Sequence, residues 1–129
     1  MLSLHRKSDT PFANIQSWLE SLATSFPPAE LEVIRRACEL SEPLYQGKFS
    51  LIGAPQLSHA VGTAAILVGM HMDHEMVAAA ILHAIPEYLE GWQTRLEKDF
   101  GTNVKVLVEG LSRMEKLGIP HSRSVISVA

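Results

Sequence analysis

Two histidines, His59 and His83, are placed where they could act on the same atom. His59 lies near the start of one apolar stretch, and His83 directly follows the next, whose sequence is MVAAAIL. If these stretches are antiparallel helices joined by a short turn, the start of one lies beside the end of the other. Two neutral imidazoles that converge on a buried point are typical ligands of a divalent metal ion. Spacing alone favours a second interpretation, in which both are ordinary histidines of the core or its rim.

Glu87 lies four residues after His83 and would share its face on a continuous helix. A carboxylate in that position could act as a general acid or base beside a metal. Pro86 disfavours such continuity, so a solvated glutamate beyond the helix end is an equal alternative. Tyr88 and Trp92, one turn apart, could stack on a nucleobase, but packing in the core is the stronger expectation.

Three further groups of polar residues have simpler interpretations. His71 and His74 could form a surface metal pair, although a polar turn between helices is the stronger expectation. Cys38 lies in an apolar stripe with no basic neighbour, which indicates a buried structural thiol. The charges in the segments EKDF and MEK are interpreted as solvated helix faces.

The elements that must position these residues are helices, because apolar residues recur every three or four positions along most of the chain. The pattern predicts an all-α fold of about six helices. Pro43 is expected to end the second helix, Asp73 to cap the fourth, and Gly101 and Thr102 to separate the last two. The clearest loop is 46–55, and MVAAAIL is expected to form the central helix. The predicted helices include residues 13–25, 28–42, 57–68, 74–84, 89–100 and 103–117.

Length and composition restrict the class of protein. A chain of 129 residues suits a single domain, and 47% hydrophobic against 19% charged residues excludes a disordered chain. A net charge of −3 gives no case for nucleic-acid binding, and one cysteine excludes an internal disulfide framework. No signal peptide, membrane span, Walker loop or dinucleotide motif is present. We therefore expect a cytoplasmic protein with no membrane partner.

A family resemblance covers residues 53–117. It is carried by the runs HAVGTAAILVGMHMDHEMVAAAILHAIPEY and FGTNVKVLVEGLSRM, which resemble the N-terminal HD domain of RelA/SpoT-type (p)ppGpp synthetase/hydrolases. The resemblance implies an HD-domain-like bundle in which residues 1–129 are one domain of a longer chain. It also implies that this bundle is truncated at its C-terminus, so apolar surface should be exposed and self-association should follow.

The same resemblance implies a site that has lost essential parts. Active members hold one manganese ion through a histidine, a His-Asp pair and a later aspartate, and remove the 3′-pyrophosphate of ppGpp. His59 and His83 match the two histidines, but Ala84 replaces the aspartate of the pair. The later aspartate would lie beyond residue 129. Glu87 matches the glutamate of a catalytic Glu-Asp pair, and Tyr88 replaces its aspartate.

Ser50, Leu51 and Ile52 replace a basic stretch that helps active members hold guanine. Together these departures imply a catalytically silent domain with no nucleotide site, no metal and no cofactor, or with Mn²⁺ only if the site is live. The parent would be a RelA-like GTP pyrophosphokinase of the stringent response, in which this domain has a regulatory or structural role. Its partner would be the synthetase domain of the same chain, with ribosome or tRNA contacts made only by other regions.

Two other functions stay open at this point. One is an active metal-dependent (p)ppGpp 3′-pyrophosphohydrolase that completes its site with unusual ligands. The other is a helical interaction module unrelated to ppGpp.

Overall fold

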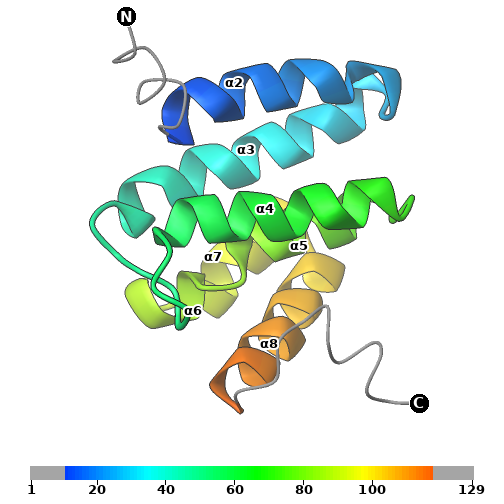
Figure 1. Ribbon diagram of the computed structural model, residues 1–129. Coiled ribbons are helices and arrows are strands. Elements are labelled where there is room, and N and C mark those ends of the chain that lie inside the picture. The colour runs from blue at the N-terminus through cyan, green and yellow to red at the C-terminus, as the bar shows by residue number, and fades with distance from the viewer. Residues whose placement is uncertain (1–10, 118–129) are drawn as a thin grey trace, which may run out of the picture.

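Helices make up most of the part of the chain that the computed structural model describes, residues 11–117 (Figure 1). Among these residues one isolated bridge, between Phe49 and Pro55, is the only β-type pairing. The predicted all-α bundle is therefore confirmed. In chain order the elements are α2 (Pro11–Ser21), η1 (Leu22–Thr24), α3 (Pro28–Tyr45), α4 (Gln56–Gly69), α5 (His74–Leu82), α6 (Ile85–Tyr88), α7 (Trp92–Phe100) and α8 (Thr102–Lys116).

The centre of the bundle is α5, which packs against α3, α4 and α8 (Figure 1). All its residues from Val77 to Leu82 are fully buried, as the apolar MVAAAIL segment predicts. Asp73 begins the helix as its N-cap, because its Oδ1 accepts a hydrogen bond of 2.9 Å from the Met76 backbone N–H. Since three helices surround α5, residues at its C-terminal end lie deep in the fold.

Several predicted helix boundaries are wrong: α2 ends at Ser21, α5 ends at Leu82 and α7 begins at Trp92. The predicted roles of Pro43 and Thr102 are also wrong. Pro43 lies inside α3, which continues to Tyr45. The proline removes one backbone donor, but the extra turn carries the Tyr45 side chain into the core, where it is fully buried. Thr102 is the first residue of α8 rather than its cap, and its hydroxyl donates to Glu97 Oε2 at 3.0 Å. The separation of α7 from α8 by Gly101 is as predicted, with a φ of 97° that favours glycine.

The buried residues of α4 lie toward its N-terminal end. Leu57, Ala60 and Ala64 are buried, whereas Ala65 is exposed. This places the first turn of α4, which carries His59, against the end of α5.

The loop between α3 and α4 folds back on itself. The Ser50 N–H donates to the Ala54 carbonyl at 2.7 Å, and the Gln56 N–H donates to the Lys48 carbonyl at 2.8 Å. Gly53 takes the positive φ, 87°, that the turn requires. The predicted loop 46–55 is therefore confirmed, and it covers one side of the end of α5.

No helix among residues 11–117 combines the length and the apolar character needed to cross a membrane. His5, His121 and the C-terminal run HSRSVISVA lie outside the described residues.

Candidate functional site

His59 and His83 converge, as their spacing predicts. Their ring centroids are 5.5 Å apart, with planes at 70° to each other. His59 is in the first turn of α4, and His83 is the residue that follows α5. The antiparallel packing of these two helices brings the start of one beside the end of the other.

A backbone contact fixes the orientation of the His83 ring. Its Nδ1 lies 2.7 Å from the Ala80 carbonyl oxygen, and the side chain is only 1% exposed. Because a carbonyl can only accept, Nδ1 carries the hydrogen in this hydrogen bond. With the hydrogen on Nδ1, the other ring nitrogen, Nε2, faces α8.

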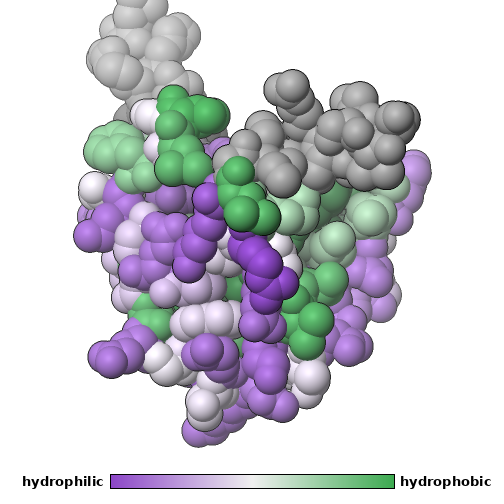
Figure 2. All heavy atoms as spheres, turned by 90° about the horizontal axis from the view of Figure 1, so that it is seen from below, coloured by the Kyte–Doolittle hydropathy of each residue, from purple (hydrophilic) through white to green (hydrophobic). Residues whose placement is uncertain are grey.

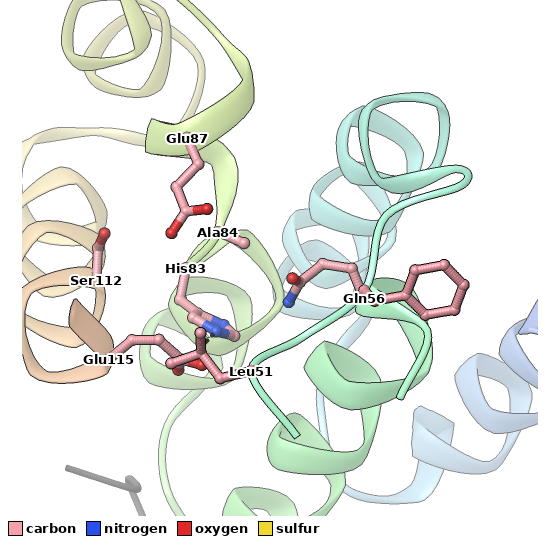
Figure 3. A pocket seen from close by; sticks show the side chains of 8 residues that line it. Leu51, Gln56, His83, Ala84, Glu87, Ser112 and Glu115 are labelled. Atoms are coloured by element: carbon pink, nitrogen blue, oxygen red, sulfur yellow. Dashed lines mark ion pairs between the residues drawn. The ribbon is translucent and has the colours of Figure 1, made fainter. Parts of the chain in front are cut away.

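Glu115 of α8 faces both histidines. Its Oε1 lies 3.3 Å from His83 Nε2, and its Oε2 lies 3.9 Å from His59 Nε2. The side chain of Glu115 is 17% exposed, so the interpretation of the segment MEK as a solvated face is wrong for this residue. Figure 3 shows the His83 and Glu115 side chains pointing toward one another.

The helical period of α8 indicates that Glu115 lies on the buried face of this helix. Val104, Val108 and Ser112 form the buried face of α8 at intervals of four residues. Glu115 follows Ser112 by three residues and therefore lies on the same face. The interval identifies the face, but the residues opposite that face are set only by the packing of α8 on α5.

Burial controls the electrostatics of the cluster. The pKa of His59 lies below its usual value, because burial disfavours the charged ring and the neighbouring His83 adds to this effect. The Glu115 carboxylate opposes the shift. A neutral His59 ring has a lone pair on its unprotonated nitrogen.

A cavity of about 30 Å³ opens beside the cluster. Glu87 reaches it from α6, although α5 ends at Leu82 and the continuous helix that would join Glu87 to His83 is absent. The methyl group of Ala84 lies at the same cavity (Figure 3). Its lining consists of Phe49, Leu51, Gln56, His83, Ala84, Glu87, Ser112 and Glu115.

The turn that carries His83 is held by Tyr45. The Tyr45 hydroxyl donates to the Ile81 carbonyl at 2.7 Å and accepts from the Ala84 N–H at 3.1 Å. One buried hydroxyl thus satisfies two backbone groups where α5 ends, so the position of His83 depends on a side chain from α3.

The other aromatic candidates pack in the core, as expected. Tyr88 is half-buried and contacts the Tyr45 ring edge-to-face, with centroids 5.9 Å apart. Lys48 Nζ lies 5.5 Å from the centre of the Tyr88 ring. Trp92 is partly buried against the core.

The loop residues and remaining candidates have distinct environments. Ser50 is buried, whereas Leu51 and Ile52 are 74% and 79% exposed.

His74 Nδ1 lies 3.6 Å from Glu30 Oε1, which ties the turn before α5 to α3. Cys38 is buried, and burial raises the pKa of its thiol to about 12, as expected for a structural cysteine.

The cluster fits a metal ion in its donor chemistry. One donor atom from each of His59, His83 and Glu115 lies within 4.8 Å of the other two. Ligands about 2.0–2.1 Å from a tetrahedral ion are roughly 3.3–3.4 Å apart, close to the 3.3 Å between Glu115 Oε1 and His83 Nε2. The aspartate that the family resemblance leads one to expect beside His83 is absent, but a carboxylate from α8 reaches the two imidazoles.

Comparisons with known proteins agree with this architecture. A protein-family model described as "HD domain" matches residues 37–127. The bifunctional (p)ppGpp synthase/hydrolase SpoT of Escherichia coli K12 is 31% identical over 102 residues, which are 79% of this chain and 14% of that protein. The guanosine-3′,5′-bis(diphosphate) 3′-pyrophosphohydrolase of Haemophilus influenzae is 35% identical over 78 residues, 60% of this chain and 12% of the relative.

A relative named as a GTP pyrophosphokinase matches as well. The GTP pyrophosphokinase rsh of Brucella ovis is 36% identical over 73 residues, which are 57% of this chain and 10% of that protein. The matched segment thus spans about 10–14% of the length of these relatives.

Proposed function

Because the chain belongs to the HD-domain family and is homologous to SpoT/RelA-type (p)ppGpp hydrolases and synthetases, we propose that it is a catalytically silent domain of a (p)ppGpp synthetase. The observation that carries the proposal is Ala84, whose methyl group lines the cavity directly beside His83. In an active member that position would provide a carboxylate ligand. A methyl group neither offsets the charge of a divalent ion nor orients water.

The proton-transfer groups support the same conclusion. Glu87 still reaches the cavity, but the adjacent Tyr88 packs its ring against Tyr45. A phenol held in this contact does not replace the second carboxylate of an acid-base pair, because it stays protonated at neutral pH. Burial moves the pKa of Tyr88 further upward.

The size and polarity of the cavity also argue against nucleotide hydrolysis. Its volume of about 30 Å³ is an order of magnitude below the roughly 300–1,000 Å³ of small-molecule sites. The neighbouring loop presents Leu51 and Ile52, which offer no charge to a pyrophosphate or hydrogen bond to guanine. A site for ppGpp would need a wider opening and basic side chains at the cavity, whereas Lys48 of this loop lies over the Tyr88 ring and does not line the cavity.

A silent domain acts through its surface, and its partner in this proposal is the synthetase domain of a longer chain. Large apolar side chains are exposed at several places, including Leu51, Ile52, Val106 and Leu117. Figure 2 shows apolar residues interspersed with polar ones on the face seen from below. Contacts with the synthetase domain or self-association would cover such residues.

The test is a pyrophosphate-release assay with ppGpp and Mn²⁺. It compares the 129-residue chain, its Ala84→Asp/Tyr88→Asp variant and an active relative as positive control. The first two are expected to be inactive, since the double substitution leaves Ser50, Leu51 and Ile52 in place. Rapid hydrolysis by the unmodified chain would overturn the proposal, and hydrolysis by the double variant would overturn the argument from the loop. The synthetase assignment requires the full-length protein, which should form (p)ppGpp from ATP and GTP or GDP.

One observation favours a second function, that of a live (p)ppGpp 3′-pyrophosphohydrolase. Glu115 returns a carboxylate to the two histidines, and Glu87 reaches the same cavity. Water activation is the chemistry that a bound divalent ion supplies. If this function is correct, Glu87→Gln abolishes hydrolysis in the same assay. Homology to (p)ppGpp enzymes argues against the third interpretation, a module unrelated to ppGpp.

A further inference from the structure

We propose that His59, His83 and Glu115 form a transition-metal site in which Glu115 of α8 serves as the carboxylate ligand. The ligand set is then assembled from three parts of the fold, namely α4, the residue after α5, and α8. This site does not depend on hydrolysis. A silent domain can hold an ion that joins three of its helices.

The donor atoms of the three side chains lie close together. Glu115 presents a different oxygen to each histidine, Oε1 to His83 at 3.3 Å and Oε2 to His59 at 3.9 Å. His59 Nε2 is buried and makes no hydrogen bond to any residue from 11 to 117. A cation among the three side chains would contact this nitrogen and the carboxylate at once.

The backbone of α5 holds the His83 ring in the orientation of a metal ligand. Metal-binding histidines commonly donate their other ring N–H to a carbonyl or carboxylate, which orients the ligand nitrogen. The 2.7 Å contact from Nδ1 to the Ala80 carbonyl has this arrangement. The ring is thereby oriented by the backbone of α5 before any ion arrives.

The three ligands are carried by a rigid part of the fold. The ligands lie on or next to helices, and α5 packs extensively against both α4 and α8 (Figure 1). Sites on packed helices hold their ligands more closely than sites on loops. The Tyr45 hydroxyl further fixes the turn after His83 through its bond with the Ala84 N–H.

The donor set also indicates which ion binds. Two imidazoles and one carboxylate suit Zn²⁺ and related ions, whereas Mn²⁺ prefers sites richer in oxygen. With Ala84 in place of an aspartate, the three side chains offer two imidazole nitrogens and one carboxylate, a set that favours Zn²⁺ or Co²⁺ over Mn²⁺. Glu87 at the same cavity adds negative charge near the ion.

Direct metal titration tests the proposal. The metal-free 129-residue chain is titrated with Co²⁺, followed by visible absorption, and then with Zn²⁺ and Mn²⁺ in competition. We expect one equivalent of Co²⁺, displacement by Zn²⁺ and at least tenfold weaker competition by Mn²⁺. Binding of less than a stoichiometric amount of Co²⁺ or Zn²⁺ overturns the proposal.

A matched pair of variants tests the role of Glu115. Replacement of groups that only support a metal ligand typically costs about 10–100-fold in affinity, so Glu115→Gln, which alters a ligand, should weaken Zn²⁺ binding by at least that factor. Glu109→Gln removes the same charge from an exposed position of α8 and should leave the affinity unchanged. Equal affinities of the two variants would exclude Glu115 as a ligand.

A measurement on the unmodified chain avoids dependence on variant folding. In ¹⁵N-detected histidine spectra, Zn²⁺ should shift the Nε2 resonances of His59 and His83 but not those of His71 and His74. The proposal is wrong if the two surface histidines shift and the cluster does not. These readouts are independent of ppGpp hydrolysis, so absence of metal and absence of activity are distinguishable.

Discussion

Removal of the Tyr45 hydroxyl should destabilise the turn that carries His83. This hydroxyl is fully buried, donates to the Ile81 carbonyl at 2.7 Å and accepts from the Ala84 N–H at 3.1 Å. Tyr45→Phe keeps the ring and its edge-to-face contact with Tyr88 but deletes both hydrogen bonds. The substitution therefore isolates the polar contribution of Tyr45 from its packing.

The expected loss follows from the two groups left behind. Each hydrogen bond contributes about 1 kcal/mol net, and a buried donor or acceptor left unsatisfied costs about 1–3 kcal/mol. Ser41 Oγ lies 3.5 Å from the Ile81 carbonyl and offsets part of the loss there, while the Ala84 N–H loses the phenol oxygen. We expect the free energy of unfolding to fall by about 2–4 kcal/mol, which lowers Tm by roughly 10 °C.

Urea and thermal unfolding followed by far-ultraviolet circular dichroism measure this change. Tyr88→Phe is the matched control, since it removes the same atom from a half-buried ring and should alter stability by less than about 0.5 kcal/mol. If Tyr45→Phe and Tyr88→Phe unfold within 0.5 kcal/mol of one another, the hydroxyl of Tyr45 does not hold the turn and the reasoning is refuted.

Three other substitutions or conditions give further predictions. Asp73→Ala removes the N-cap of α5 and should cost about 1 kcal/mol in urea unfolding, whereas Asp73→Asn should retain most of it. His83→Ala should cost roughly 1–3 kcal/mol through lost packing and loss of the ring hydrogen bond to the Ala80 carbonyl, and unchanged stability would argue against a structural role. Burial raises the pKa of Cys38 from 9.0 to about 12, so the folded protein keeps this proton while the unfolded chain releases it. Its contribution to stability is therefore complete below pH 9 and should be lost progressively between pH 9 and about 12. Iodoacetamide at pH 8 should label Cys38 slowly in the native chain and rapidly in urea.

Local patterns were sufficient for much of the fold. The MVAAAIL segment predicts the buried α5 because no polar residue interrupts it, and Asp73 predicts the start of that helix because a side-chain oxygen can accept from the first turn. Convergence of His59 and His83 followed from the same logic, since short turns make sequential helices antiparallel. The first two predictions depend on near neighbours in the chain, and the third depends on the short turn that joins two sequential helices.

The resemblance to RelA/SpoT-type hydrolases also predicts two departures from an active site. Ala84 and Tyr88 follow His83 and Glu87, the residues that the resemblance matches to active members, so the chemical consequence of each departure can be predicted from the sequence. The structure adds that the Ala84 methyl lies at the cavity and that the Tyr88 ring packs on Tyr45.

Tertiary structure alone decided the remaining parts of the site. Glu115 belongs to the cluster because α8 crosses α5, 32 residues away from His83 in the sequence, and a helical period defines a face but not what lies opposite it. Pro43 stays within α3 because burial of Tyr45 outweighs a lost backbone hydrogen bond. The histidine pair was thus determined by local sequence, whereas its carboxylate partner and the hydroxyl that fixes it depend on long-range packing.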